Sequence, residues 1–529
     1  MVQHKPGQTQ KARATVSRMT SRVLSDGSLT KKASLNAMAS GIDYAARLVV
    51  GLLVSPILLT RLGDAGFGVW QVLQKLIGHA GPASGRPGEA LKWVVASKQS
   101  SQDLHEKRQL VGNAVAVWFL FLPVIALVGA VLGWFAPIWL HVPSGSYTSV
   151  RIAAAILVAD LIMRSLTALP QAVLEGENMG YKRVGLSTTL VFVGGLLTVL
   201  AAVSGGGLVA VAMATLATTI LSGAMYLFIT RSRVAWFGIA KPSIHAAGRF
   251  VRLSGWFLLW NLVMLLMKGG DVIVLGIAGS ATLVTSYTLT RYVPEAITAI
   301  VALMIFAVMP GLGGVIGAGQ HERAIRVRSE TMSLAWLMAT VAGAMVLVWE
   351  RSFLTLWVGP GYYPGMLATL LIVTMVLQFA LIRTDSNIID LTLNLRWKTL
   401  LGLLSAVMSM AIGWVLVSAF GLGIVGLATG FIAGRSIISV AYPTMIGRFL
   451  RIRPQDQVRG MVRPGLVTLA LFATAAWAGL HVDASSWLML VLSVGMSVGL
   501  VGVAAFFCGL GATRRGEMVE RVREMVAAR

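Results

Sequence analysis

The sequence contains few charged residues and almost no cysteine. Only 12% of its 529 residues are Asp, Glu, Lys or Arg, whereas soluble domains typically carry about 25%, which argues against a soluble enzyme. The single cysteine, Cys508, cannot form an intrachain disulfide, and it excludes cysteine-cluster metal sites and CxxC redox chemistry. There is no GxxxxGK(S/T) phosphate loop, so we expect no ATPase in the chain.

Long apolar runs fill most of the sequence. Hydrophobic residues make up 56% of the chain, and the mean hydropathy is +0.77. Because a membrane helix needs about 20 predominantly apolar residues, the sequence predicts an all-α, polytopic membrane protein with about fourteen spans. These lie near residues 35–60, 66–97 (broken), 110–134, 150–173, 184–204, 208–230, 250–278, 282–316, 331–349, 366–384, 399–419, 424–446, 464–481 and 486–509.

The basic residues indicate the topology. The formal net charge is +23, but the Lys and Arg residues lie between apolar spans, so we expect no binding to nucleic acid. They gather in the N-terminal tail, in every second loop and in the C-terminal tail, while the alternate loops carry only Arg61, Arg151 and Arg351. Basic residues accumulate on the cytoplasmic side of a membrane. We therefore expect an inner-membrane protein with both termini in the cytoplasm and the first apolar run as a permanent anchor.

A weak internal similarity indicates two halves. The first span is followed by small residues around Gly63 and by an aromatic, Trp70, and the seventh span by Gly279 and then Tyr287. Six spans separate the two copies, so both have the same orientation. Parallel repeats of this kind are common in transporters, where the substrate lies between the halves.

Several segments resemble a known family. They are LTRLGDAGFGVWQ (59–71), KGGDVIVLGIAGSATLVTSYTLTRYV (268–293), LTLWVGPGYYPG (354–365) and GLGIVGLATGFIAGRSI (421–437), with Ser34-Leu35-Asn36 before the first span. Together they are similar to polysaccharide (O-antigen, Wzx-type) flippases of the multidrug/oligosaccharidyl-lipid/polysaccharide (MOP) exporter superfamily. The similarity is dispersed in chain order over residues 34–450.

The resemblance implies two six-helix lobes around a central cavity, followed by a C-terminal helix pair. The expected division is a basic disordered tail (1–33), an N-lobe (34–231), a C-lobe (232–447), the helix pair (448–510) and a basic cytoplasmic tail (511–529). The implied function is the flipping of an undecaprenyl-diphosphate-linked oligosaccharide from the cytoplasmic to the periplasmic leaflet. The expected partners are this glycan lipid, the bilayer and polysaccharide polymerase or chain-length proteins, and we expect a monomer.

Ionisable residues inside the spans are the candidate functional groups, because such residues are costly in a membrane and face protein or water. Most of them occur three or four positions apart, where side chains share one helix face, and Lys75 has no such neighbour. The pairs are Asp43 with Arg47, Asp160 with Arg164, Lys268 with Asp271, and Arg291 with Glu295.

Two interpretations of these pairs remain open. Each pair could only neutralise itself, or the charges could line one cationic cavity between the lobes. In the second case the basic residues would bind the substrate, namely Arg47, Lys75, Arg164, Lys268 and Arg291. The acidic residues would pair with these basic residues or couple transport to an ion. Asp271 is the first candidate for a proton- or sodium-linked carboxylate. The other acidic candidates are Asp43, Asp160 and Glu295. We expect no catalytic residue, metal or cofactor.

Two polar segments interrupt the apolar pattern. Residues 78–89 break the second span with Gly, Pro and charged residues. Such a break is tolerated only where it is buried or lines water, so this segment either lines the cavity or leaves the membrane early. Four polar residues follow the tenth span, namely Asp385, Asn387, Asp390 and Asn394. We expect them in a solvated loop rather than in an inner gate.

Other functions within and beyond the superfamily stay open. A lipid II flippase and a drug or cation antiporter are alternatives of the same superfamily, although an antiporter would favour acidic residues without basic partners. A membrane-embedded glycan polymerase or ligase is the alternative from another class. Such enzymes usually carry a large periplasmic loop, and the loops here are short, so we expect a transporter and not an enzyme.

Overall fold

The computed structural model describes residues 27–98, 103–177, 184–242, 244–391, 395–512 and 514–516. Every regular element in this part of the chain is helical. The first helix begins at Gly27, so residues 27–33 are helical and not disordered as expected. The rest of the expected N-terminal tail and most of the C-terminal tail lie outside the described residues.

The helices of the first half cover the expected spans one to six. They are α2 (Gly27–Gly78), η1 (Gly81–Ser84), α3 (Pro87–Ser97), α4 (Leu104–Trp139), η2 (Ser144–Ser146), α5 (Tyr147–Gly176), α6 (Val184–Val203) and α7 (Gly207–Arg233).

The helices of the second half cover the remaining expected spans. They are α8 (Ile244–Ala278), α9 (Ala281–Thr290), α10 (Tyr292–Gly317), α11 (His321–Trp357), η4 (Pro360–Tyr362), α12 (Met366–Leu391), α13 (Leu395–Ser418), α14 (Gly423–Leu450), α15 (Pro454–Gly479), α16 (Trp487–Ala504) and the π-helical turn η5 (Ala505–Gly509).

By length and composition, 12 helices of the described chain could cross a membrane, or 13 when the bent pair α9–α10 counts as one span. This agrees with a polytopic membrane protein and is lower than the fourteen spans expected. The difference lies in α2, which contains both the first and the second expected span. With 52 residues a straight α2 would be about 78 Å long, far longer than the hydrocarbon core of about 30 Å.

The backbone of α2 leaves helical geometry at Gly63. Its φ of 71° and ψ of 170° belong to a region that is open essentially to glycine alone. Before Gly63, the carbonyl of Leu48 accepts a hydrogen bond from Tyr292 of α10. Next to Gly63, the carbonyl of Asp64 accepts from Thr285 of α9. The first arm of α2 therefore runs alongside α9 and α10.

The second arm of α2 runs alongside α8. Gly68 lies against Ala281 at the start of α9, Val72 against Gly276, and His79 against Gly269. The residue numbers rise along α2 while they fall along α8, so the second arm runs antiparallel to α8. Both arms extend from the turn between α8 and α9 in the same direction, and the chain reverses at Gly63.

The second expected span is broken as its sequence indicates. α2 ends at Gly78, the short helix η1 follows, and α3 begins after two residues with positive φ, Gly85 and Arg86. Gly85 has no space for a side chain, because a Cβ would lie 2.7 Å from the ring of Phe121. Pro87 occupies the first position of α3, where its missing N–H costs nothing.

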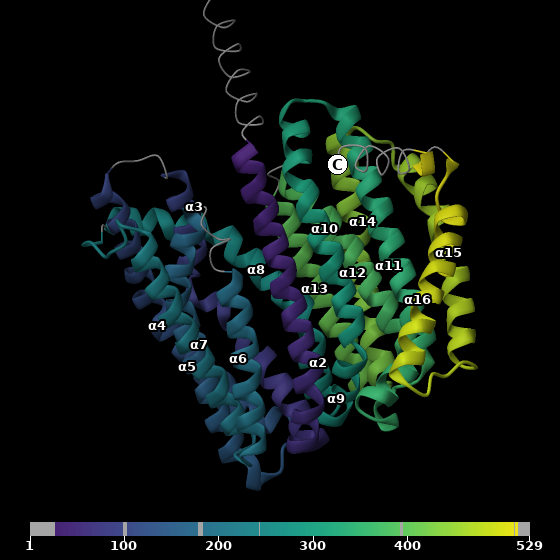
Figure 1. Ribbon diagram of the computed structural model, residues 1–529, viewed down its shortest axis with the longest axis horizontal. Coiled ribbons are helices and arrows are strands. Elements are labelled where there is room, and N and C mark those ends of the chain that lie inside the picture. The colour runs from purple at the N-terminus through teal and green to yellow at the C-terminus, as the bar shows by residue number, and fades with distance from the viewer. Residues whose placement is uncertain are drawn as a thin grey trace, which may run out of the picture.

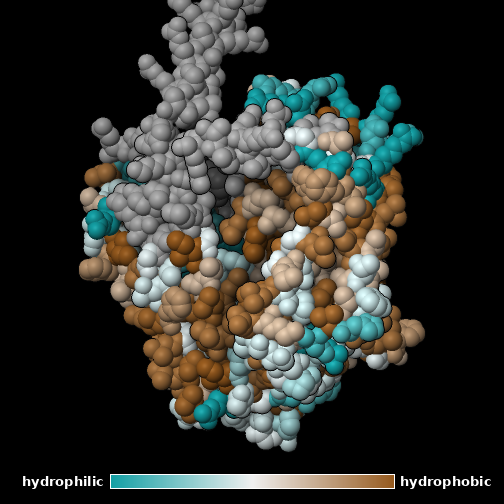
Figure 2. Space-filling view, turned by 45° about the vertical axis from the view of Figure 1, so that its right-hand side comes forward, coloured by the Kyte–Doolittle hydropathy of each residue, from teal (hydrophilic) through white to brown (hydrophobic). Residues whose placement is uncertain are grey.

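Two groups of helices are separated in Figure 1, with α3 to α7 on the left and α10 to α16 on the right. α2 and α8 lie between them, and the two groups approach each other at the bottom of the view. α9 and α10 meet at a bend of 49°. Figure 2 shows that most of the visible side surface is hydrophobic, with a hollow between the two groups and hydrophilic residues inside it.

Candidate functional site

A cavity of about 510 Å³ lies between α2, α8, α10, α12 and α14. Basic side chains outnumber acidic ones in its lining. The basic residues are Arg47, Lys268, Arg291, Arg383 and Arg435, and the acidic residues are Asp43 and Glu295. Five of the nine residues expected from the sequence therefore line a single cavity, and its excess of positive charge suits an anionic ligand.

Asp271 lies behind this cavity and positions Arg291. The Asp271 side chain is completely buried. One of its oxygens accepts hydrogen bonds from Arg291 and from the hydroxyl of Tyr287, the latter at 2.8 Å. The other oxygen accepts from the backbone N–H of Val272 at 2.8 Å. Arg291 also donates to the carbonyl of Lys268 at 3.0 Å, so its guanidinium is fixed at the edge of the cavity.

The expected pair of Lys268 and Asp271 is thus wrong. Asp271 points from α8 toward the junction of α9 and α10, whereas Lys268 is exposed and lines the cavity. The expected neighbour of Arg291, Glu295, lies 3.8 Å away and lines the cavity as well.

The expected pair of Asp43 and Arg47 is also not formed. Asp43 accepts hydrogen bonds from Ser187 at 2.5 Å and from Thr188 at 3.0 Å, which joins α2 to α6. Arg47 is exposed and, among the described residues, forms no ion pair. Its guanidinium is therefore available to a ligand in the cavity.

Arg435 is a cavity residue that the sequence analysis did not identify. Its side chain is only 2% exposed. It donates to the carbonyls of Met267 on α8 at 2.6 Å and Met375 on α12 at 3.3 Å. The rings of Phe379 and Phe431 lie 5.0 and 5.3 Å from its guanidinium carbon. An arginine within the apolar segment GFIAGRSI was a usable signal, because a lone charge in a span rarely lacks a function.

Lys75 does not line this cavity. It lies on the second arm of α2, against Gly269 of α8, where a Cβ would come within 3.3 Å of its side chain. His79, one turn further on, contacts the Lys75 carbonyl. Lys75 is therefore close to α8, one residue position from Lys268, but it faces a different side of that helix.

Asp160 and Arg164 form the expected pair, at 2.6 Å. Asp160 is buried and also accepts from Thr219 of α7 at 2.5 Å. Arg164 lines a second pocket, of about 220 Å³, between α5 and the segment η1–α3. Of the nine expected residues, five line the large cavity and Arg164 lines the second pocket, whereas Asp160 and Asp271 are buried and Lys75 lies against α8. The nine residues therefore do not share one cavity, as the second of the two open interpretations required.

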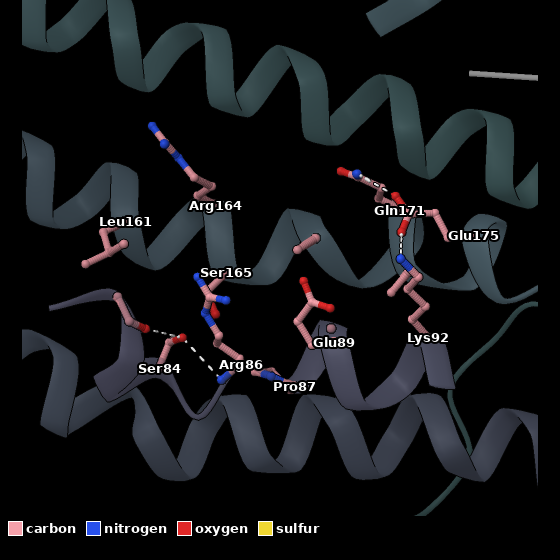
Figure 3. Close-up of a pocket in the computed structure, with 14 residues that line it drawn as sticks. Ser84, Arg86, Pro87, Glu89, Lys92, Leu161, Arg164, Ser165, Gln171 and Glu175 are labelled. Atoms are coloured by element: carbon pink, nitrogen blue, oxygen red, sulfur yellow. Dashed lines mark hydrogen bonds and ion pairs between the residues drawn. The ribbon is translucent and has the colours of Figure 1, made fainter. Parts of the chain in front are cut away.

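The broken segment of the second span forms one wall of this second pocket. Ser84, Arg86 and Glu89 line it from η1 and α3, and Figure 3 shows Glu89 directed toward α5. Arg86 donates to Asn261 of α8 at 2.6 Å, and so joins this wall to the helix between the two groups. The segment lines this smaller pocket and not the cavity between the two groups of helices, where the sequence analysis had placed it as one of two possibilities.

The acidic residues after the tenth span do not lie in a solvated loop. They are part of α12, which extends to Leu391. Asp385 is buried and pairs with Arg328 of α11 at 2.8 Å. Asp390 pairs with Lys398 of α13 at 2.5 Å. These two ion pairs connect α11, α12 and α13 at one end of the second group of helices.

Comparisons with known proteins agree with this architecture. Residues 101–313 match a family described as Polysaccharide biosynthesis protein. No curated protein matches the chain. Among solved structures, the lipid II flippase MurJ in an inward closed conformation is 12% identical, with a TM-score of 0.66 over 89% of this chain and 98% of that one.

Two structures of a multidrug resistance MATE family transporter of the MOP superfamily are also similar. The inward-facing conformation is 15% identical, with a TM-score of 0.61 over 77% of this chain and 98% of that one. The outward-facing conformation is 12% identical, with a TM-score of 0.52 over 80% of this chain and 97% of that one. The chain therefore shares the fold of these solved proteins.

Proposed function

We propose that the chain transports an undecaprenyl-diphosphate-linked oligosaccharide across a membrane, because residues 101–313 match a polysaccharide biosynthesis family and the fold is similar to that of a transporter of the MOP superfamily. The direction is from the cytoplasmic to the periplasmic leaflet of the inner membrane, for the synthesis of a surface polysaccharide. Both termini lie in the cytoplasm, and segments 34–231 and 232–447 act as two lobes around the substrate.

The observation that carries this proposal is the basic excess in the cavity of about 510 Å³, where Arg47, Lys268 and Arg291 meet Arg383 and Arg435. A diphosphate has two adjacent charged groups, and the forked N–H donors of arginine match phosphate oxygens. Arg47 is free to bind, whereas Arg291 is fixed in place by Asp271. Preorganised donors of this kind bind an anion at little cost in conformational entropy.

The same charge distribution disfavours a drug or cation antiporter. A cationic drug in this cavity would meet five basic and two acidic side chains, and repulsion between like charges reduces affinity. Lipid II also carries an undecaprenyl diphosphate, so the cavity does not separate a lipid II flippase from our proposal. The match of residues 101–313 to the polysaccharide biosynthesis family favours a polysaccharide precursor.

Deletion of the gene tests the proposal. We expect undecaprenyl-linked repeat units to accumulate on the cytoplasmic side, and the wild-type gene to restore export. A gene with Arg47→Ala should restore little export, because the cavity loses its free guanidinium. Arg448→Ala is a matched control, since Arg448 is exposed near the end of α14 and away from the cavity. Normal export of every surface glycan in the deletion strain would contradict the proposal.

A further inference from the structure

The pocket of about 220 Å³ between α5 and η1–α3 is polar but nearly neutral. Its charged lining consists of Arg86, Lys92 and Arg164 against Glu89 and Glu175. Most of these charges are already balanced by partners in the protein. Lys92 pairs with Glu175 at 2.8 Å, and Arg164 pairs with Asp160 at 2.6 Å. The pocket therefore offers hydrogen-bonding groups without the basic excess of the larger cavity.

The polar groups in this pocket suit hydroxyl groups. Among the described residues, the Glu89 carboxylate takes part in no hydrogen bond or ion pair, and it is exposed to the pocket. A carboxylate only accepts hydrogen bonds, and a guanidinium only donates them. Glu89 and Arg86 are three residues apart and both line the pocket (Figure 3). One N–H of Arg86 bonds to Asn261, and a guanidinium has further donors, so the two residues could accept from and donate to hydroxyls of one sugar. Gln171, on the opposite wall, adds an amide whose nitrogen already donates to Glu175 at 3.0 Å.

The helices around the pocket pack against one another in series. α2 packs against α6, α6 against α7, α7 against α5, and α5 against α3, while α4 covers the other side of α3. Asp160 bonds to Thr219 of α7, and Arg164 follows one turn later on the same face of α5. The Arg164 side chain is 61% exposed, so the pocket is accessible at this residue.

The two pockets contact the same face of α8. Arg86 of the small pocket bonds to Asn261, and Lys268 lines the large cavity. These positions are seven residues apart, which corresponds to two helical turns and about 10 Å along the axis. A ligand with an anionic group at Lys268 could therefore extend along α8 toward Arg86.

We propose that the pocket between α5 and η1–α3 binds uncharged sugar residues of the transported glycan, while the larger cavity holds its diphosphate. This inference rests on the proposed function. A site that forms hydrogen bonds with substrate hydroxyls discriminates strongly against ligands that lack them. The pocket would thus determine which glycans the protein accepts.

Binding to the purified protein in nanodiscs tests the inference with two probes. One probe is undecaprenyl diphosphate, and the other is the undecaprenyl-diphosphate-linked oligosaccharide isolated from the deletion strain. We expect Glu89→Ala to weaken binding of the glycosylated probe about tenfold, as for the loss of a hydrogen bond to a charged group. Binding of undecaprenyl diphosphate should not change, and Gln171→Ala should show the same selectivity with a smaller effect.

Two further variants calibrate the result. Arg47→Ala should weaken binding of both probes, because it acts on the diphosphate. Glu322→Ala should change neither, since Glu322 is also an exposed acidic residue in the first turn of a helix but lies outside both pockets.

The other outcomes separate the two proposals. If Glu89→Ala leaves both probes unaffected while Arg47→Ala weakens both, the sugar pocket is wrong and the proposed function stands. If Glu89→Ala weakens both probes equally, the pocket belongs to the diphosphate site and the inference is overturned. If the wild-type protein binds neither probe, the proposed function fails and the inference fails with it.

Discussion

Arg291 and Asp271 form an ion pair between the bend of α9–α10 and the interior of α8, with Asp271 completely buried and Arg291 at the wall of the cavity. The two residues are 20 positions apart in the sequence. Removal of one partner of a buried ion pair leaves an uncompensated charge, which typically costs about 3–5 kcal/mol. The pair therefore contributes to both the fold and the cavity.

The first prediction concerns this pair. We expect Asp271→Asn to lower the free energy of unfolding by about 3–5 kcal/mol, because the Arg291 charge loses its partner. Thermal denaturation of the purified variant measures the effect. Asp483→Asn is the control, since Asp483 is exposed and lies 3.8 Å from Arg351, and exposed pairs contribute about 0–1 kcal/mol. Equal melting temperatures for the two variants would contradict this account.

The second prediction concerns Gly63. Gly63→Ala should destabilise the protein by about 1–3 kcal/mol, because alanine is strained at a φ of 71° and a ψ of 170°. No atom lies within 4 Å of the position of its Cβ, so strain and not a clash is the cause. Gly41 also has free space but lies in regular helix. Gly41→Ala should therefore be neutral or slightly stabilising, and a loss of stability there of the same size would refute the argument.

The third prediction concerns Arg435. Arg435→Lys should lower both stability and transport, because a single ammonium cannot replace a planar guanidinium that contacts two carbonyls and two aromatic rings. Hydrogen bonds to charged groups contribute about 1.5–3 kcal/mol each, so we expect a clear fall in melting temperature. Arg448→Lys on the same helix, at an exposed position, should behave like the wild type.

The fourth prediction concerns pH. The Tyr362 hydroxyl donates to the Asp64 carboxylate at 2.5 Å, and this bond, together with burial and the Asp64 charge, raises the pKa of Tyr362 to about 12. A tyrosine of the unfolded chain titrates near pH 10. The stabilisation from the neutral hydroxyl is therefore fully present below about pH 10, and it is lost as the pH rises toward 12.

The Tyr362→Phe variant has no hydroxyl to titrate, so it should lose less stability than the wild type as the pH rises. Thermal denaturation of both proteins between pH 9 and about pH 12 measures this difference. An unchanged pH dependence in the variant would show that the Tyr362–Asp64 bond does not contribute. Below pH 9 the variant should be slightly less stable than the wild type at every pH, because the hydrogen bond is absent.

The sequence predicted the spans better than the contacts between them. Apolar length and the distribution of basic residues depend on the membrane, so they can be recognised one segment at a time. The partners of Asp43 and Asp271 depend on which helices are neighbours. Asp43 bonds to Ser187, 144 residues away, and Asp271 bonds to Arg291. Spacing along one helix only indicates which side chains share a face.

Two residues of the candidate sites, Arg435 and Glu89, show the same limit of prediction from the sequence. Arg435 has no charged residue three or four positions away, so a search for pairs did not select it. Glu89 lies in the broken segment, whose composition predicted a polar cavity wall but not that α5 forms the opposite wall. In both cases the missing information is the packing of helices that are far apart in the sequence.

The reversal of α2 at Gly63 has a consequence for conformational change. Near this turn α2 is bonded to the second half of the chain by three hydrogen bonds, from Trp357 to the Leu52 carbonyl, from Thr285 to the Asp64 carbonyl and from Tyr362 to the Asp64 side chain. If the two halves separate during a cycle, these bonds form a latch on one side of the bilayer. The two bonds to carbonyls contribute about 0.5–1.5 kcal/mol net each, and the bond to the Asp64 carboxylate about 1.5–3 kcal/mol, so the latch is weak enough to open and close reversibly at physiological temperature.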